Sequence, residues 1–401
     1  MTTALIIGGG VAGPISAIAL AKAGIKPVVY EAYDRTADGI GANLVLAVNG
    51  YHALLQLGVD HLAAGFDIPM YRYHLGSGRV LAEVPNGNPL PDGTVARAIT
   101  RSDLYNALRG EAIGRGIQIE FGRRLTDAKV TADGVVAYFS DGSEARGDLL
   151  IGADGANSVV RRLINGGDVP LRFGGMVTTS GYARGVDVPG EPGTEFMYLG
   201  KRSFFCYIHH TNGDIWWYAA PTWPEEPTKE TLSALAPQQW RAQLLDMFAA
   251  DDSAAIDIIN ATEEITPPRP IYDLPTVPTW RNERMVIIGD ACHAVSPSGG
   301  QGVSMAIEDA VELGRCLRDV PNTADALARY EQIRRPRVEK VVEFGREASR
   351  SIAVNGRVGR VFRDLFLPIA FNQKAAEKDL EHMSWLYGHR IDWDAPVGAG
   401  S

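Results

Sequence analysis

The chain has 401 residues, of which 45% are hydrophobic and 22% charged, a length that accommodates two or three globular domains. A net charge of −9 argues against nucleic acid as a partner, and the apolar run at residues 365–371 is far too short to cross a bilayer. Three cysteines without paired spacing predict neither a disulfide framework nor a zinc site. The first residues lack the features of a secretory signal, and we expect a cytoplasmic protein.

Residues 3–32 predict a strand, a tight turn, a helix and a second strand. The turn reads GGGVAG, in which Gly8, Gly10 and Gly13 form a G-x-G-x-x-G pattern. Glycines let the backbone approach a pyrophosphate, which rests on the N–H groups of the helix start. Glu31 ends the second strand, where an acid accepts hydrogen bonds from an adenosine ribose. This unit therefore favours FAD or NAD over NADP.

The next part of the chain predicts two helices and a small sheet. Residues 49–63 and 101–115 have helical patterns, and residues 118–155 alternate apolar and polar residues around two Asp-Gly turns. This alternation predicts an antiparallel sheet that returns to a buried strand. Asp154 and Gly155 follow that strand, and taken alone they are also consistent with an ordinary turn.

Aromatic residues concentrate between residues 173 and 272, which predicts a second sheet, with a helix at 237–250. Alternation along its strands gives two faces, of which one is expected to line a substrate cavity, but it does not decide which. Core packing is the alternative role for these side chains. The candidate substrate contacts are Phe205, Tyr207, His210 and Trp217.

Residues 284–314 return to a buried strand, followed by the loop GDACHAVSPSGGQG and a helix. Asp290 follows the strand directly, where its carboxylate can bind a polyol hydroxyl. The glycines before Val303 lead into a helix start, which offers N–H donors and a positive dipole end to an anion. Cys292 and His293 are neighbours on an extended segment and point to opposite faces, so packing is favoured over a nucleophile–base pair or a metal site.

Two further helices are predicted at residues 303–317 and 323–353, the second rich in arginine. The simplest interpretation of these arginines is a solvated helical face, with attraction of NADPH phosphates as the alternative. The residues concerned are Arg334, Arg335, Arg337, Arg346 and Arg350.

In their order and spacing, the motifs at residues 8–13, 148–162 and 284–314 resemble those of the class A flavoprotein monooxygenases, the para-hydroxybenzoate hydroxylase-like family. The resemblance runs from residue 3 to about residue 345. It implies an α/β fold in which a Rossmann-type FAD-binding domain is interleaved with an antiparallel-sheet substrate domain, an α+β insert, and is followed by long C-terminal helices. The implied divisions are 1–72, 97–172 and 273–320 for FAD binding, 73–96 and 173–272 for substrate, and 321–401 for the C-terminal helices.

The resemblance also implies where FAD binds. The implied FAD contacts are Gly8, Gly10, Ala12 and Gly13 at the pyrophosphate, Glu31 at the adenosine ribose, Asp290 at the ribitol, Gly302 and Val303 at the flavin edge, and Arg101, Asp154 and Pro297. Pro297 lies in the loop that faces both flavin and substrate. No side chain is assigned to catalysis with certainty, and no metal is expected.

A family member is expected to be a single-component enzyme with tightly bound, non-covalent FAD. NADPH or NADH reduces the flavin, O2 adds to give a flavin C4a-hydroperoxide, and one oxygen passes to an aromatic or polycyclic small molecule. Epoxidation of an electron-rich alkene is a close variant, and flavin-dependent alkene reduction is the alternative from a different class. The expected assembly is a monomer or homodimer.

Overall fold

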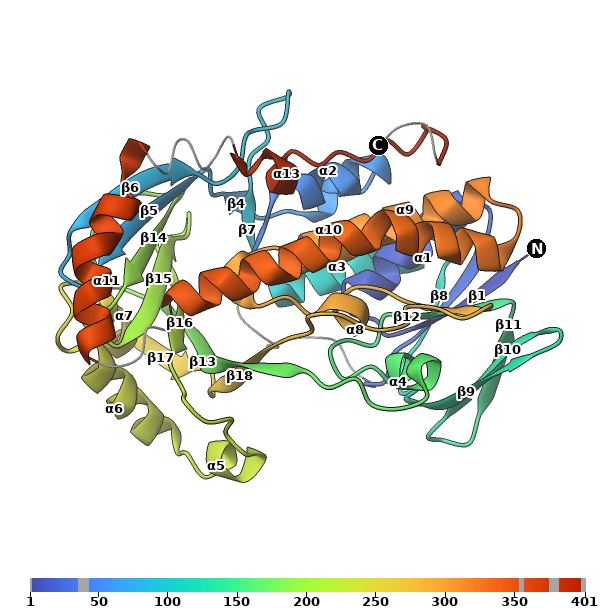
Figure 1. Cartoon of the computed structure of the whole chain (residues 1–401), viewed down its shortest axis with the longest axis horizontal. Coiled ribbons are helices and arrows are strands. Elements are labelled where there is room, and N and C mark those ends of the chain that lie inside the picture. Colours follow the sequence, from blue (N-terminus) through green and yellow to red (C-terminus); the bar gives the residue numbers. More distant parts are fainter. Residues whose placement is uncertain (1, 35–42, 353–356, 375–381, 398–401) are drawn as a thin grey trace.

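A five-stranded sheet forms the core of one half of the molecule (Figure 1). In this computed structural model, which describes residues 2–34, 43–352, 357–374 and 382–397, the strand order is β19-β12-β1-β2-β8. The strands are β1 (Thr3–Ile7), β2 (Lys26–Tyr30), β8 (Gln118–Glu120), β12 (Leu149–Gly152) and β19 (Met285–Ile287). All four pairings are parallel, so the loops that follow β1, β12 and β19 emerge at one edge of the sheet.

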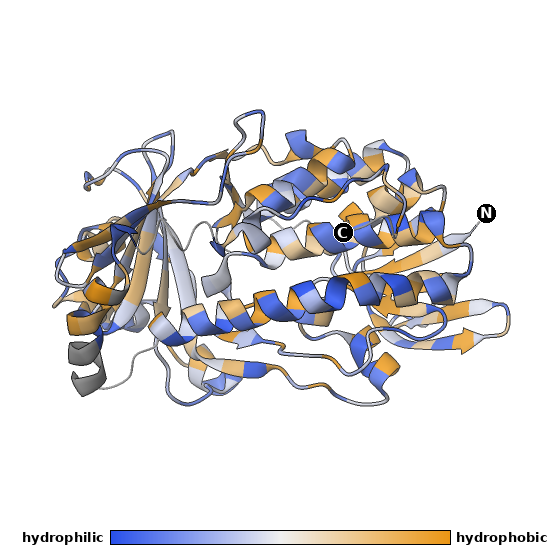
Figure 2. Ribbon diagram, turned by 45° about the horizontal axis from the view of Figure 1, so that its top comes forward, coloured by the Kyte–Doolittle hydropathy of each residue, from blue (hydrophilic) through white to orange (hydrophobic). Residues whose placement is uncertain are grey.

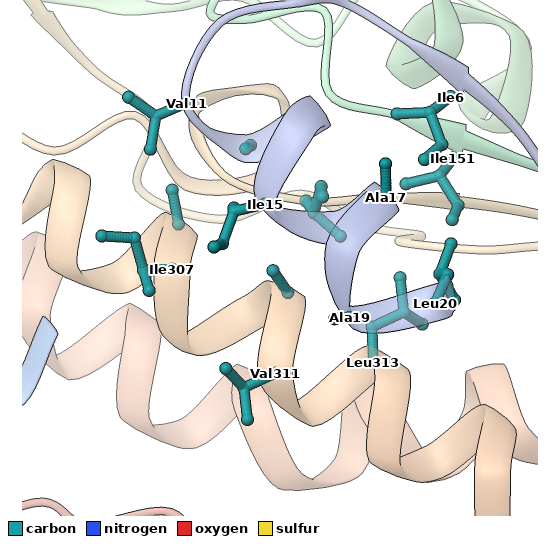
Figure 3. Packing of buried hydrophobic residues seen from close by; sticks show 14 of the residues in the cluster. Ile6, Val11, Ile15, Ala17, Ala19, Leu20, Ile151, Ile307, Val311 and Leu313 are labelled. Carbon is teal, nitrogen blue, oxygen red and sulfur yellow. The ribbon is translucent and has the colours of Figure 1, made fainter. Parts of the chain in front are cut away.

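Two helices pack against each other beside this sheet. They are α1 (Ala12–Lys22) and α9 (Gly302–Asp319). Ile15 of α1 lies against Ile307 of α9, and further side chains continue the contact (Figure 3). Both isoleucines are fully buried, and burying such a side chain stabilises the fold by roughly 1.5–3 kcal/mol. The contact fixes the starts of both helices relative to the sheet edge.

Shorter elements complete this half. The helices are α2 (Val48–Gln56), α3 (Arg101–Gly114), α4 (Val159–Asn165), α8 (Asp290–His293) and the 3-10 turns η1 (Asp60–Leu62) and η2 (Pro297–Gly299). One small sheet holds β9 (Leu125–Thr131), β10 (Gly134–Phe139) and β11 (Glu144–Gly147), and another β3 (Asn43–Leu46), β4 (Phe66–Asp67) and β7 (Arg97–Thr100). The antiparallel pairing predicted within residues 118–155 holds for β9 to β11, whereas β8 instead joins the parallel sheet beside β2.

An eight-stranded sheet occupies the other end of the molecule (Figure 1). Its order is β17-β13-β16-β15-β14-β5-β6, with β18 paired to β13. The strands are β5 (Met70–Leu75), β6 (Val80–Pro85), β13 (Arg172–Ala183), β14 (Thr194–Leu199), β15 (Ser203–His209), β16 (Ile215–Pro221), β17 (Thr262–Ile265) and β18 (Arg269–Asp273). The predicted division between residues 72 and 73 falls inside β5. The whole of this strand belongs to the large sheet, where it pairs in parallel with β14.

Helices cover the large sheet and connect the two halves. They are α5 (Lys229–Ser233), α6 (Pro237–Phe248), α7 (Ala255–Asn260), α10 (Thr323–Ile352), α11 (Arg357–Ala370) and α13 (Ser384–Tyr387). α10 has 30 residues, which corresponds to about 45 Å of helix, and runs lengthwise between the two sheets (Figure 1). Its surface alternates between hydrophilic and hydrophobic residues, while the strands have long hydrophobic stretches (Figure 2). No helix in the described ranges is long and apolar enough to cross a membrane. The predicted α/β class is confirmed.

Candidate functional site

The turn between β1 and α1 can be built only with glycine at two of its positions. Gly8 has a φ of +108°, and a Cβ there would lie 2.3 Å from the carbonyl oxygen of Ala153. A Cβ on Gly13 would lie 1.9 Å from the carbonyl oxygen of Gly8. The glycines therefore let the first turn of α1 pack directly against the ends of β1 and β12.

The start of α1 borders a large cavity. Val11 and Ala12 line this cavity, and no side chain caps the helix N-terminus. A Cβ on Gly10 would have nothing closer than the Tyr105 hydroxyl, at 3.9 Å. The first N–H groups of an uncapped helix attract an anion, so this side of the cavity is suited to a pyrophosphate.

Glu31 stabilises the same turn by hydrogen bonds to its backbone. Its carboxylate accepts hydrogen bonds from the backbone N–H of Gly9 at 2.6 Å and of Tyr33 at 3.0 Å. Arg109, which is buried on α3, lies 3.5 Å from Glu31 and donates from Nε to the carbonyl oxygen of Gly9 at 2.6 Å. Glu31 does not line the cavity, so the implied ribose contact remains a prediction. Arg109 was not predicted from the sequence, where it is a basic residue beside the apolar Leu108 in a predicted helix.

Asp154 caps a helix. Its carboxylate accepts hydrogen bonds from the Ser158 hydroxyl at 2.5 Å and from the N–H groups of Val159 at 2.7 Å and Val160 at 3.2 Å, at the start of α4. Burial raises the pKa of this carboxyl above its usual value, and these hydrogen bonds oppose the rise. The neighbouring Gly155 lines the cavity, but Asp154 does not. These hydrogen bonds fix the position of Asp154, and its implied contact with FAD remains a prediction.

Asp290 presents an exposed carboxylate to the cavity at the start of α8. Arg101 and Tyr105, at the start of α3, line the same region and are hydrogen-bonded to each other. The Asp290 carboxylate is also close to α9, because a Cβ on Gly302 would lie 3.9 Å from its Oδ1. The predicted Arg101 and Asp290 are thereby brought together at the cavity wall, and Tyr105 joins them.

The start of α9 provides a second uncapped helix N-terminus on the cavity. Gly302 and Val303 line the cavity, as does Pro297 in the preceding turn. Gln301, the residue before the helix, does not cap it. Its side chain instead accepts a hydrogen bond from Asn49 at 3.1 Å, which leaves the first N–H groups of α9 available to a ligand.

A buried ionic cluster lies between α9 and α10. Arg334 donates to Glu308 at 2.6 Å and to Asp309 at 2.8 Å, and Arg337 donates to Glu308 at 2.8 Å. His293 lies 2.5 Å from Asp309. Burial alone would raise the pKa of Glu308, but the charges of Arg334 and Arg337 outweigh it and lower that pKa to about 2.

This cluster corrects the interpretation of the helix arginines. Arg334 is only 1% exposed and Arg337 is partly buried, so they do not belong to a solvated face. The physical reason is that two adjacent carboxylates on α9 are buried and require positive partners. Cys292 is also buried, and burial raises the pKa of its thiol well above the usual value. In the described residues no group of three or more histidine, cysteine or acidic side chains is arranged to hold a metal ion.

Two of the four substrate contacts predicted on the large sheet line the cavity, and two do not. Phe205 does not line the cavity, and its ring packs against Phe248 of α6. Tyr207 and Trp217 do line it, but their rings belong to the core cluster under α6 and α7. The Tyr207 hydroxyl donates a hydrogen bond to the carbonyl oxygen of Pro189, and the Trp217 indole N–H donates one to the hydroxyl of Thr262.

His210 also lies outside the cavity lining. Its ring stacks on Trp216 at 4.7 Å between centroids. Both faces of this sheet are buried, one under helices and one around the cavity, so alternation alone could not separate them. Besides Tyr207 and Trp217, the strands of the large sheet contribute to the cavity lining Tyr71, Tyr73, Thr178, Ser180, Glu195, Met197, Leu199, Phe204, Cys206, Ile208, Trp216, Tyr218 and Arg269.

The cavity has a volume of about 660 Å³ and joins the two halves of the molecule, a size typical of small-molecule sites. One wall has the two uncapped helix starts, Arg101 and Asp290, and the other is the inner face of the large sheet. The residues present fit FAD, because the glycine turn and α1 suit its pyrophosphate, Asp290 suits its ribitol hydroxyls, and α9 suits its electron-rich flavin edge.

Comparisons with known proteins point to one family. Residues 1–345 match the family model described as the FAD binding domain. The FAD-dependent urate hydroxylase of Klebsiella pneumoniae is 31% identical over 350 residues, which cover 84% of this chain and 87% of that protein. The 3-amino-4-hydroxybenzoate 2-monooxygenase PtnB3 of Streptomyces platensis is 31% identical over 407 residues, which cover 98% and 97%. The solved structure of Klebsiella pneumoniae HpxO complexed with FAD and uric acid is similar with a TM-score of 0.82, at 26% identity over 95% of each chain.

Proposed function

The chain belongs to this FAD-binding family, and on that premise we propose that it is a single-component monooxygenase that uses FAD, NAD(P)H and O2 to hydroxylate a small aromatic molecule. The observation that carries this proposal is the cavity itself. Two uncapped helix starts and Asp290 lie on one wall, and the opposite wall is a sheet face rich in aromatic side chains. A flavin held against the first wall leaves the second for an aromatic ring.

In the proposed complex, Gly8, Gly10, Ala12 and Gly13 hold the FAD pyrophosphate, Glu31 the adenosine ribose, Asp290 the ribitol, and Arg101, Pro297, Gly302 and Val303 surround the flavin. FAD supplies hydride acceptance and O2 activation when bound. The N–H groups of α9 stabilise negative charge at the flavin edge, because they lie at the positive end of an 18-residue helix. The cavity walls position the ring and exclude water.

The reaction consumes one NAD(P)H, one proton and one O2 for each substrate. One oxygen atom replaces a ring hydrogen as a hydroxyl group, and the other leaves as water. The test supplies the FAD-loaded enzyme with NADPH or NADH, ¹⁸O2 and a panel of hydroxylated and amino-substituted aromatics. We expect a product that contains one ¹⁸O atom.

Two outcomes would contradict this proposal. If the ¹⁸O label enters no organic product, a monooxygenase is excluded. Reduction of an alkene without O2 would establish the alkene reductase alternative. Epoxidation would also insert one ¹⁸O atom but would remove a double bond, which the product spectrum identifies.

The protein is proposed to act in the cytoplasm, as a monomer or homodimer. Cys206, Cys292 and Cys316 are all buried free thiols, which suits a reducing compartment. Fractionation of the producing cells tests the first point, and light scattering of the purified holoenzyme tests the second.

A further inference from the structure

The cavity wall formed by the large sheet contains one acidic side chain, Glu195 of β14. Alternate residues of this strand, Glu195, Met197 and Leu199, line the cavity. Phe196 and Tyr198 point to the other face, into the core under the helices. Glu195 therefore faces the space proposed for substrate, a position that was not predicted from the sequence.

Polar side chains from three other elements surround Glu195. Tyr71 lies beside it because β5 pairs in parallel with β14, and Tyr73 follows on the same face. Tyr387 of α13 lines the same part of the cavity, and the Cys206 thiol is hydrogen-bonded to the Glu195 carboxyl. Burial, together with the nearby Glu195 charge, raises the pKa of all three tyrosine hydroxyls. These hydroxyls and the thiol are neutral near pH 7.

No basic side chain in the described ranges forms an ion pair with Glu195. Burial raises the pKa of its carboxyl to about 7, and only the hydrogen bond with Cys206 opposes this. The basic residues that line the cavity are Arg101 on α3 and Arg269 on β18. β18 pairs with β13, and β13 lies three strands from β14 in the sheet. The separation between β13 and β14 is therefore roughly 14 Å. Glu195 thus forms an acidic end of the cavity.

A carboxylate without a positive partner is costly in a partly desolvated site. A ligand that donates a hydrogen bond to it, or brings positive charge, reduces this cost, and hydrogen bonds to charged groups are stronger than neutral ones. A ligand carboxylate at the same place would be repelled by the like charge. The cavity end is therefore selective for the polar group that a substrate presents there.

We propose that Glu195 determines the substrate class of this enzyme: the aromatic substrate presents a hydroxyl or amino group to the Glu195 carboxyl, and a carboxylate is excluded from the end formed with Tyr71, Tyr73 and Tyr387. This inference rests on the proposed function for the aromatic ring and adds the substituent that the site selects. Glu195 is a binding residue in this proposal and transfers no proton.

The test measures binding without turnover. Three symmetric probes, resorcinol, 1,3-dimethoxybenzene and isophthalate, present the same group at both ends, so their orientation in the cavity does not matter. Each is titrated into the FAD-loaded enzyme at pH 8, and the dissociation constant is taken from the change in flavin absorbance. We expect resorcinol to bind about 10-fold more tightly than 1,3-dimethoxybenzene, and isophthalate to bind most weakly.

Substitutions then test whether Glu195 causes this order of probe affinities. Glu195→Leu should remove the preference for resorcinol, Glu195→Gln should relieve the exclusion of isophthalate, and Glu195→Lys should make isophthalate the best ligand. Glu191→Gln, which removes an exposed acid just before the same strand, should preserve the wild-type order. FAD content and circular dichroism identify any variant that misfolds, and Glu195→Gln is the conservative variant in that case.

The inference is overturned if isophthalate binds wild-type enzyme most tightly, or if folded Glu195→Leu and Glu195→Gln keep the wild-type order. Its failure is distinguishable from failure of the proposed function. Binding in the expected order without any oxygen insertion would contradict only the proposed function. Hydroxylation of aromatic carboxylates with a KM that Glu195→Leu leaves unchanged would contradict only this inference.

Discussion

Gly13 lies directly against the carbonyl oxygen of Gly8, so that a Cβ on Gly13 would stand 1.9 Å from this oxygen. Gly13 belongs to α1, and Gly8 directly follows β1. Their contact sets the distance between the helix start and the sheet edge, and with it the position of the N–H groups that face the cavity.

Gly13→Ala should abolish tight FAD binding, because the added methyl group forces α1 away from β1. The measurement is the FAD retained per chain after gel filtration. Gly110→Ala is the matched control, since a Cβ at this position in α3 meets nothing within 4 Å. It should bind FAD normally and gain up to about 1 kcal/mol of stability. Full FAD retention by folded Gly13→Ala would contradict the proposed cradle.

Glu31→Ala should weaken FAD binding by roughly 10-fold or more, because the turn loses the carboxylate that accepts from the Gly9 N–H at 2.6 Å. The same change leaves the buried Arg109 without its acidic partner. Equilibrium titration of the apoprotein with FAD gives the dissociation constant. Glu144→Ala, at an exposed position on β11, should leave it unchanged, and equal affinities for the two variants would exclude this role of Glu31.

Arg334→Met should destabilise the protein by roughly 3–5 kcal/mol, since it leaves buried carboxylates without their positive partner. Denaturant unfolding at pH 7 measures this loss. Arg350→Met on the same helix removes an exposed arginine, 60% exposed and 4.0 Å from Glu343, and should cost less than about 0.5 kcal/mol. Similar losses for the two variants would show that the buried cluster is energetically unimportant.

The same cluster predicts acid sensitivity. In the folded protein the pKa of Glu308 is about 2, well below that of an unfolded glutamate, so the unfolded chain binds more protons between these values. The stability from this group is full above about pH 4.5 and is lost as the pH falls towards 2. Denaturant midpoints across this range should fall with pH in wild type and less steeply in Glu308→Gln. Parallel slopes would contradict the linkage.

Cys292→Ala should retain FAD and near-normal turnover, because the thiol is 1% exposed and its raised pKa leaves it protonated. The expected cost is a modest loss of stability from a small cavity. The assay compares turnover and FAD content of the variant and wild type. An inactive variant with full FAD content would mean that this cysteine has a chemical role.

The sequence predicted the cofactor half of the molecule best because its constraints are local. Gly8 and Gly13 have conformations or contacts that few other residues tolerate, and a short helix follows them at once. Asp290 is equally local, since it comes directly after a buried strand. Such features are visible wherever the chain must turn closely at a strand end.

Side-chain environments that depend on tertiary packing could not be predicted from the sequence. The strand with Phe205 has both faces buried, one under α6 and one around the cavity, so alternation alone gave no direction. Arg334 lies in a helix whose charged composition is typical of a solvated face. Its partner Asp309 lies 25 positions earlier, on another helix. Glu195 was overlooked for the same reason, because its isolation from bases depends on the arrangement of whole strands.

The outer wall of the cavity comes from the end of the chain. Ser351, Leu367, Phe371 and Tyr387 all line it, and all follow the region from residue 1 to 345 that defines the family. The glycine turn and both helix starts lie within that region. The family region thus supplies the glycine turn, both helix starts and the sheet wall with Glu195, while the residues after it add one further part of the cavity lining. An exchange of this last part between relatives would change the shape of the cavity without touching the residues proposed to hold FAD.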